Sequence, residues 1–242
     1  MTTDGAQVFL IGAGPGAADL ITVRGARLLA QADVVLYDAL VTAEMLDLCP
    51  QAEKISVGKR SGQRSAAQEH INQLLVDCVR RYRCVIRLKG GDPMLFGRAD
   101  EELSALEAAG ITYQIVPGIT TALAAAASAH QPLTKRGVAR SVALFTSSTA
   151  PGETENPHIP TCDTLVQYMG GREASLTAMR MMAAGYAGHL PVVVIENVSR
   201  ADEVIRRMNL LELSAGLPPS TGPVLVMTGE AMRERQRGSV PG

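Results

Sequence analysis

The chain has 242 residues, of which 46% are hydrophobic and 19% are charged, and its formal net charge is −1 at pH 7. This composition is that of an ordinary globular protein, and the near-zero charge gives no overall field that would attract nucleic acid or an anionic membrane. No stretch approaches the roughly 20 apolar residues of a membrane span, and the first residues do not resemble a secretory signal, so we expect a cytoplasmic protein.

Strand and helix patterns alternate through the first half of the chain. In chain order they fall at residues 7–14 (strand), 19–32 (helix), 33–38 (strand), 65–79 (helix), 84–91 (strand), 99–110 (helix) and 111–118 (strand). The helix at 65–79 is predicted to begin with a capping box of Ser65 and Gln68. Such alternation indicates a mainly parallel sheet that is covered by helices.

A second series of patterns follows Pro117. A helix is predicted at 120–129 and another after residue 170, with strands at 141–148, 164–170, 190–197 and 222–230. A further helix is expected between the last two strands. We therefore predict an α/β fold of two domains, residues 1–118 and 119–242, each with a mainly parallel sheet flanked by helices.

The four cysteines are Cys49, Cys78, Cys84 and Cys162. They form no CxxC pair, and no histidine stands at ligand spacing from any of them. We therefore predict free thiols, mostly buried, and no metal site.

Four predicted strands run directly into small residues, in the segments "FLIGAGPG", "IRLKGGDP", "QIVPGITT" and "VQYMGG". The carboxyl ends of parallel strands share one edge of a sheet, where ligands bind. Glycine lets the backbone approach a ligand closely. These segments therefore indicate a binding site.

A dinucleotide is one candidate ligand for this site. Gly12, Gly14 and Ala17 match the G-x-G-x-x-G/A pattern, and Asp38 stands roughly where a ribose-binding acid would. Pro15 counts against this interpretation, because it stands where a helix N-terminus should offer N–H groups to a pyrophosphate. An NAD(P)-dependent oxidoreductase is therefore kept as an alternative.

Other motifs resemble those of the tetrapyrrole (precorrin) methylase family. The matching stretches stand in the order typical of that family, and they are "VFLIGAGPGAADLIT", "ADVVLYDALV", "VGKRSG", "RLKGGDPMLFGR", "VPGITTALAAAASAHQPLTKRGVARS", "YMGG", "PVVVIEN" and "VLVMTGE". The combination of "GGDPxxFGR" with "VGKR" and "PGIT" is far more specific than the glycine pattern alone.

The resemblance implies two α/β domains with S-adenosylmethionine in a cleft between them, in a homodimer. It implies two methyl transfers to uroporphyrinogen III that yield precorrin-2, for sirohaem or cobalamin synthesis, with S-adenosylhomocysteine as the other product. Carried over by motif, the cofactor contacts are Pro15, Gly90, Gly91, Asp92, Leu95, Thr120, Thr121 and Met169.

The resemblance also implies roles in catalysis and in substrate binding. It makes Asp38 the proton acceptor and Lys59 the proton donor. The substrate is an anionic tetrapyrrole, and Arg98, Lys135 and Arg136 would bind its carboxylates.

Several positions depart from the family's usual pattern. They are Lys135, Val138, Ser147, Ser148 and Val198. Val198 replaces a glycine on the expected cofactor wall, where its side chain would tighten or displace the adenosine site. A different precorrin, another anionic acceptor, or an inactive tetrapyrrole-binding protein therefore remain as alternatives.

Overall fold

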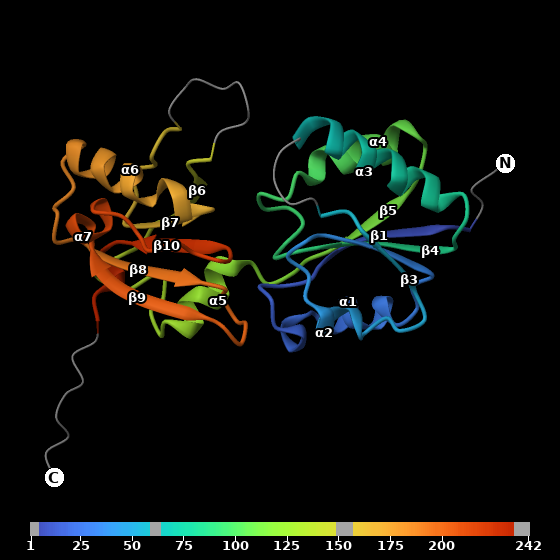
Figure 1. Ribbon diagram of the computed structural model, residues 1–242, viewed down its shortest axis with the longest axis horizontal. Coiled ribbons are helices and arrows are strands. Elements are labelled where there is room, and N and C mark those ends of the chain that lie inside the picture. Colours follow the sequence, from blue (N-terminus) through green and yellow to red (C-terminus); the bar gives the residue numbers. More distant parts are fainter. Residues whose placement is uncertain (1–4, 59–63, 149–156, 235–242) are drawn as a thin grey trace, which may run out of the picture. The chain divides into compact units, whose positions relative to one another are not determined.

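A computed structural model describes residues 5–58, 64–148 and 157–234. The chain divides into two compact units, Met1–Thr121 and Ala122–Gly242. Each unit contains one five-stranded sheet with helices packed on it (Figure 1).

The first unit is a parallel sheet in the order β3-β2-β4-β1-β5. Its elements are β1 (Gln7–Gly12), η1 (Ala18–Leu20), α1 (Val23–Leu29), β2 (Val34–Tyr37), α2 (Ala43–Leu46), β3 (Glu53–Ser56), α3 (Arg64–Val79), β4 (Cys84–Lys89), α4 (Ala99–Ala108) and β5 (Tyr113–Val116). All four strands predicted in this half of the chain are present. The short edge strand β3 was not predicted, because its sequence "EKIS" is polar and mostly exposed.

Helices cover both faces of this sheet. In β1, Phe9 and Ile11 pack in the core on the side of α1 and α2, whereas Val8 and Leu10 pack on the side of α3 and α4 (Figure 1). Successive side chains of a strand point to opposite faces, so a strand that is buried on both faces has an unbroken apolar sequence. Burial of each such side chain contributes about 1.5–3 kcal/mol.

The start of α3 differs from the prediction. The helix includes Arg64, so Ser65 is a helical residue and not the residue that precedes the helix. The side-chain amide of Gln68 donates instead to Asn72 Oδ1 at 3.0 Å and to Glu102 Oε1 at 3.4 Å. The predicted capping box is therefore wrong, because Ser65 is already a helical residue and does not hold the position that precedes the helix.

The second unit has a mixed sheet in the order β6-β7-β10-β8-β9. Its elements are α5 (Thr121–Ser128), β6 (Val142–Thr146), β7 (Thr164–Tyr168), α6 (Gly170–Ala183), β8 (Pro191–Glu196), β9 (Val204–Asn209), α7 (Leu210–Ser214), β10 (Val224–Thr228) and η2 (Glu230–Met232). Helices α6 and α7 bury their apolar sides against one face of this sheet (Figure 1).

The predicted α/β fold class is confirmed, but the second sheet is not mainly parallel. Only the β6–β7 pair is parallel, and the other three pairs are antiparallel. Residues 197–203 join β8 to β9 too briefly for the crossover that a parallel pair needs. Where a single helix was expected between β8 and β10, the chain forms the edge strand β9 and then α7, which Asn209 and Glu212 cap.

One carboxylate ties together the segments that lead into β6 and β7. Asp163 Oδ2 accepts hydrogen bonds from the backbone N–H groups of Arg140 (2.8 Å) and Ser141 (2.9 Å) and from the Ser141 hydroxyl (2.8 Å). The Arg140 N–H and the two Ser141 donors hold the pKa of Asp163 below its ordinary value of 3.8. Because the pKa is depressed in the folded state, this stabilisation is present above pH 3.8 and is lost as the pH falls through the folded-state pKa.

Asp163→Asn is therefore expected to lower the melting temperature at neutral pH, because a neutral amide accepts these three bonds less strongly. The deficit relative to wild type should shrink on acidification, since the wild-type carboxylate is then protonated too. Thermal melts followed by circular dichroism at several pH values test this. A deficit that stays constant down to the acid limit would contradict the ionic role.

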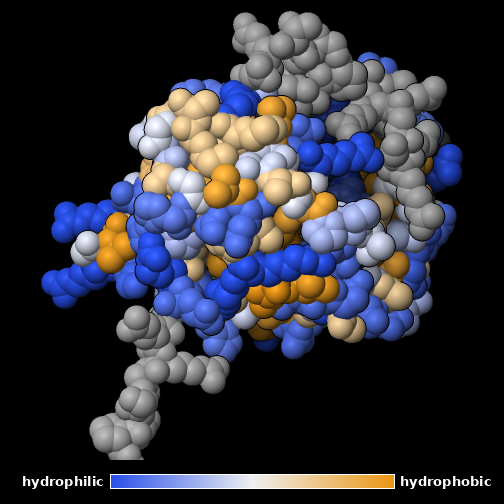
Figure 2. All heavy atoms as spheres, turned by 60° about the vertical axis from the view of Figure 1, so that its left-hand side comes forward, coloured by the Kyte–Doolittle hydropathy of each residue, from blue (hydrophilic) through white to orange (hydrophobic). Residues whose placement is uncertain are grey.

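None of the helices in the described ranges is long and apolar enough to cross a membrane. On the face shown in Figure 2, groups of hydrophobic residues are interspersed among hydrophilic ones.

Candidate functional site

Loops from three neighbouring strands meet at the carboxyl edge of the first sheet. The loop after β1 pairs with the loop after β4: the Ala13 N–H donates to the Lys89 carbonyl at 2.7 Å, and Gly14 and Gly91 exchange hydrogen bonds of 3.1 and 2.7 Å. Gly14 and Gly91 have φ values of 76° and 68°, which glycine adopts without strain. The two loops therefore form one continuous backbone wall.

The loop after β5 closes this wall through two glycines and one carboxylate. Asp92 Oδ2 accepts from the Gly118 N–H at 2.9 Å, and Asp92 Oδ1 accepts from the Met94 N–H at 2.8 Å. A Cβ atom on Gly12 would lie 2.5 Å from Gly118 Cα, and one on Gly118 would lie 2.2 Å from the Gly91 oxygen. Only glycine fits at these two positions. We call the backbone around Gly12, Gly91, Asp92 and Gly118 the glycine junction.

The glycine junction brings together many of the predicted cofactor contacts. Gly90, Gly91 and Asp92 belong to it, and Pro15 follows Gly14 directly. Leu95 is held by a hydrogen bond of 3.3 Å from its N–H to the Asp92 carbonyl. The predicted contacts Thr120 and Thr121 follow Gly118 in the chain and are partly buried.

The same geometry argues against a dinucleotide site. The Gly14 N–H is already bonded to the Gly91 carbonyl. No α-helix starts at the glycine motif, because η1 follows it and α1 begins only at Val23. A phosphate would therefore lack the Gly14 N–H and the α-helix N-terminus that such sites use.

The predicted proton acceptor, Asp38, follows β2 directly at the same edge of the sheet. Its side chain is 31% exposed, and Arg87 of β4 donates a hydrogen bond from Nη2 to Asp38 Oδ1. Lys59, the predicted proton donor, lies outside the described residues.

Arg87 belongs to a buried ionic network that the sequence analysis missed. Arg87 Nε donates to Glu102 Oε1 at 3.0 Å, and Lys89 Nζ donates to Glu102 Oε2 at 2.8 Å. All three side chains are at most 2% exposed. Burial, reinforced by the nearby Arg87 charge, lowers the pKa of Lys89 below its ordinary value. The sequence carried one signal of this network. Two basic residues, Arg87 and Lys89, stand two apart on the same face of an otherwise apolar strand.

Arg98, a predicted substrate ligand, stands just before α4 in a left-handed conformation with φ of 52°. Its guanidinium binds Glu101 with two hydrogen bonds, Nε to Oε1 at 2.6 Å and Nη2 to Oε2 at 2.7 Å. Both side chains are exposed by more than two fifths. An exposed pair of this kind contributes about 0–1 kcal/mol.

The remaining predicted contacts belong to the second unit. Met169 precedes α6 with φ of 56°, and its side chain is 52% exposed. Lys135 and Arg136 are exposed in a turn that the Lys135 and Ala139 backbones close with bonds of 2.8 and 2.9 Å.

The positions that depart from the family pattern have different surroundings in the second unit. Ser147 is buried, and its hydroxyl lies 3.1 Å from Thr177 Oγ1 and accepts from Gln167 Nε2 at 3.1 Å. Val198 is 2% exposed, whereas Val138 is 44% exposed. Ser147 and Val198 are therefore packing residues, and only Val138 of these three offers much surface to a ligand.

Val198 stands in the loop after β8, between two residues with left-handed backbones, Asn197 and Ser199. The Asn197 side chain donates to Asp202 Oδ2 at 2.8 Å, which fixes this loop from within. Ser148 uses its backbone N–H to bind Thr146 Oγ1 at 3.1 Å.

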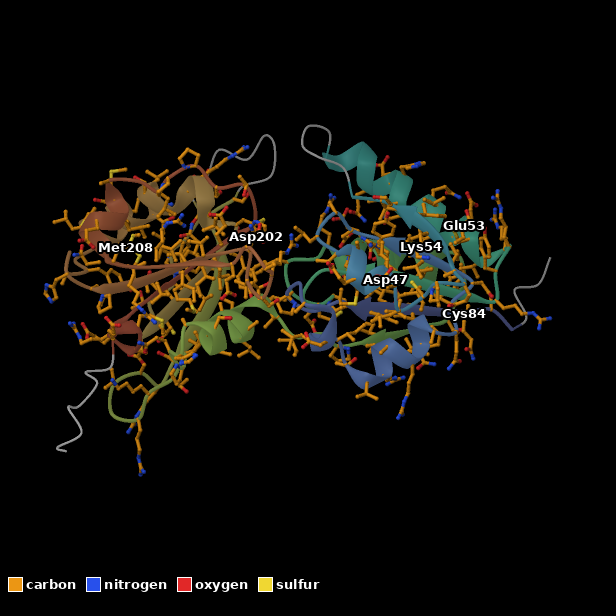
Figure 3. The ribbon with its side chains drawn as sticks, turned by 60° about the horizontal axis from the view of Figure 1, so that its bottom comes forward. Asp47, Glu53, Lys54, Cys84, Asp202 and Met208 are labelled. Atoms are coloured by element: carbon orange, nitrogen blue, oxygen red, sulfur yellow. The ribbon has the colours of Figure 1, made fainter. Side chains whose placement is uncertain are left out.

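The cysteines take no part in this site. Cys49 and Cys78 are buried, Cys84 and Cys162 are partly buried, and all four are free thiols. Burial raises the pKa of the Cys49, Cys78 and Cys84 thiols, which lowers the fraction present as the nucleophilic thiolate. Cys84 is the first residue of β4, and it lies with Glu53 of β3 at the opposite edge of the sheet (Figure 3). Among the described residues, no group of three or more His, Cys, Asp or Glu side chains is placed to hold a metal ion.

The sequence of this chain is similar to those of a known protein family and of curated proteins. The family of Tetrapyrrole (Corrin/Porphyrin) Methylases matches residues 7–214. Siroheme synthase 1 of Serratia proteamaculans is 42% identical over 233 residues, which cover 93% of this chain and 48% of that protein. The chain thus spans about half the length of the curated relatives that it matches.

Solved structures match over nearly the whole chain. Uroporphyrin-III C-methyl transferase from Thermus thermophilus, complexed with S-adenyl homocysteine, is 35% identical with a TM-score of 0.82, and the match covers 94% of each chain. A cobalamin biosynthetic enzyme, cobalt precorrin-4 methyltransferase, is 29% identical with a TM-score of 0.81 and covers 97% of this chain and 99% of its own.

Proposed function

Because this chain belongs to the tetrapyrrole methylase family, we propose that it is an S-adenosylmethionine-dependent C-methyltransferase acting on uroporphyrinogen III. In this proposal it adds two methyl groups, through precorrin-1, and releases precorrin-2 and S-adenosylhomocysteine. The product would serve sirohaem or cobalamin synthesis. The proposal includes a homodimer and a cytoplasmic location.

One observation carries the proposal. The Thermus thermophilus uroporphyrin-III C-methyl transferase that was crystallised with S-adenyl homocysteine matches 94% of this chain at 35% identity. A match of this extent includes both units, whereas the curated relatives are about twice as long as the chain.

The glycine junction fits a cofactor of this kind. A Cβ atom on Gly91 would meet no heavy atom within 4 Å, so the wall is open at that residue. In the proposal, the main chain at Gly90, Gly91 and Asp92 holds the cofactor, with Pro15, Leu95, Thr120, Thr121 and Met169 as further contacts. Asp92 then acts by shaping the loops, because both of its carboxylate oxygens already accept backbone N–H groups.

When bound, S-adenosylmethionine supplies an electrophilic methyl group on a positively charged sulfur. The protein must then orient a pyrrole carbon in line with that group, which accounts for much of the rate enhancement. Asp38, partly exposed at the end of β2, is assigned as the acceptor of the proton that the methylated ring loses. Lys59 is assigned as the proton donor.

The acceptor carries carboxylates, and exposed cations are assigned to bind them. Arg98 can exchange Glu101 for a substrate carboxylate, and its planar guanidinium suits a bidentate contact. Lys135 and Arg136, exposed in the second unit, are assigned the same task.

We expect mass spectrometry to detect two added methyl groups on anaerobically generated uroporphyrinogen III after incubation with the protein and S-adenosylmethionine. The matched control omits S-adenosylmethionine and should leave the tetrapyrrole mass unchanged. Absence of methylation, with S-adenosylhomocysteine still binding the protein, would contradict the acceptor and leave the cofactor assignment in place.

A different precorrin is the second candidate acceptor. The similarity to cobalt precorrin-4 methyltransferase, at 29% identity and over 97% of this chain, favours it. The same mass-spectrometric assay separates the two candidates when the acceptor is exchanged for a precorrin that is already methylated.

A further inference from the structure

Four charged side chains of alternating sign form a connected chain in the first unit: Asp38, Arg87, Glu102 and Lys89. Arg87 and Lys89 come from β4, Asp38 from the end of β2, and Glu102 from α4 (Figure 1). Asp38 is 31% exposed, and the other three side chains are at most 2% exposed. The chain of charges therefore runs from the protein interior to one partly exposed carboxylate.

Glu102 anchors the buried end of this chain. One of its oxygens accepts from Arg87 Nε at 3.0 Å and the other from Lys89 Nζ at 2.8 Å. Gln68 of α3 adds a longer hydrogen bond of 3.4 Å to the first oxygen. Because both oxygens are engaged, Glu102 has little freedom to rotate, and it fixes the guanidinium that it binds.

Arg87 is also held by backbone acceptors on both strands. Its Nη1 donates to the Leu88 carbonyl at 3.1 Å and to the Leu36 carbonyl at 3.4 Å, and its Nη2 donates to Asp38 Oδ1. A planar guanidinium with acceptors on Nε, Nη1 and Nη2 is fixed in position and orientation. Its Nη2 atom therefore presents a rigid donor to the Asp38 carboxylate.

Apolar side chains could hold this face of the sheet together without such a network. The neighbouring positions on this face of the sheet are apolar, among them Leu10, Leu36 and Val85. Replacing buried ion pairs by well-packed apolar residues is often neutral or stabilising. The lowered pKa of Lys89 agrees with the cost of burying this charge. The network instead places the immobilised guanidinium of Arg87 beside Asp38, the member of the network whose side chain is partly exposed to solvent.

We propose that Arg87, held in place by Glu102, which Lys89 anchors in turn, is the positioning residue that orients the Asp38 carboxylate for proton acceptance. This inference rests on the proposed function, in which Asp38 accepts the proton lost by the methylated tetrapyrrole. Arg87 is shielded from solvent and acts through Asp38 without touching the substrate.

A kinetic double-mutant cycle tests the inference, with Arg87→Lys, Asp38→Asn and the double variant assayed for methylation of uroporphyrinogen III. Lysine keeps the positive charge but cannot bond Glu102, two carbonyls and Asp38 at once. We expect Arg87→Lys to lower kcat by roughly 100-fold, the effect of a small misplacement of a catalytic group. KM for uroporphyrinogen III and the affinity for S-adenosylhomocysteine should stay within about twofold, well below one tenfold step in binding.

The double variant is expected to be no slower than Asp38→Asn alone, because Arg87 acts only through Asp38. If Arg87 had only a structural role, the fold-changes in kcat caused by Arg87→Lys and Asp38→Asn would multiply in the double variant. That result would overturn the inference. So would a rise in KM at unchanged kcat. Arg80→Lys is the matched control, since Arg80 also pairs with an aspartate but is 69% exposed, and it should leave kcat unchanged.

If Arg87→Lys does not fold, Glu102→Asp takes its place in the cycle. This substitution keeps every charge but moves the anchoring carboxylate back by one methylene, so kcat should fall relative to wild type. In the Asp38→Asn background, Glu102→Asp should cause no further fall in kcat. An unchanged kcat in a folded Glu102→Asp protein would overturn the inference. Wild-type protein that methylates no tetrapyrrole would overturn the proposed function and this inference with it, whereas an active wild type with a multiplicative cycle would overturn the inference alone.

Discussion

Asp38→Asn is expected to lower kcat for tetrapyrrole methylation by roughly 10²- to 10⁴-fold, the usual contribution of a general base. Asparagine has nearly the size of aspartate and keeps an oxygen that can accept the hydrogen bond from Arg87, but it cannot take up a proton. Affinity for S-adenosylhomocysteine should stay within about twofold, less than one tenfold step, because Asp38 is not part of the glycine junction.

Steady-state kinetics under anaerobic conditions and calorimetric titration with S-adenosylhomocysteine measure the two quantities separately. Asp77→Asn is a suitable control, since Asp77 of α3 also pairs with an arginine and its side chain is 39% exposed. Equal losses of turnover and of cofactor affinity in Asp38→Asn would indicate a structural role for Asp38 and would contradict its assignment as the proton acceptor.

Gly118→Ala is expected to weaken binding of S-adenosylhomocysteine by roughly 10- to 100-fold. The new methyl carbon would lie 2.2 Å from the Gly91 oxygen and 2.7 Å from Gly12 Cα, so the backbone of the junction has to move. Overpacking of this kind costs about 1–3 kcal/mol, and every 1.4 kcal/mol changes an affinity tenfold. The loss should appear in the dissociation constant measured by calorimetry.

Gly188→Ala provides the control for this variant. There the added carbon would lie 3.4 Å from Leu211 Cβ, an ordinary contact, in the segment before β8. A Gly118→Ala protein that keeps wild-type affinity would show that the glycine junction does not form the cofactor wall. A thermal melt separates weaker binding from general destabilisation.

Much of the first unit could be predicted from the sequence, because its central strands are short apolar runs that end in glycine. The pattern placed β1, β4 and β5 and gathered Gly91, Asp92 and their neighbours at one edge. The edge strands β3 and β9 were missed for one physical reason. β3 carries Glu53 and Lys54, and β9 carries Arg206 and Arg207, so the sequences of these two strands lack the apolar signal that marks the predicted strands.

The sequence did not reveal how the site residues bind one another. Asp92 was predicted to contact the cofactor, but its carboxylate bonds to Gly118, 26 residues away. The pairing of Arg87 with Asp38 spans 49 residues and depends on β2 and β4 being neighbours. Contacts of this kind follow from strand order, and local patterns do not specify strand order.

The hydrogen bonds that Gly14 and Gly91 exchange lower the entropic cost of binding a ligand at the glycine junction. Two loops that already pair with each other, and that Asp92 ties to a third, have little conformational entropy left to lose when a ligand arrives. The loops after β1, β4 and β5 become ordered when the protein folds and not when the ligand binds. At the glycine junction the ligand therefore meets a backbone wall that is already formed, so ordering of these three loops adds little to the free-energy cost of binding.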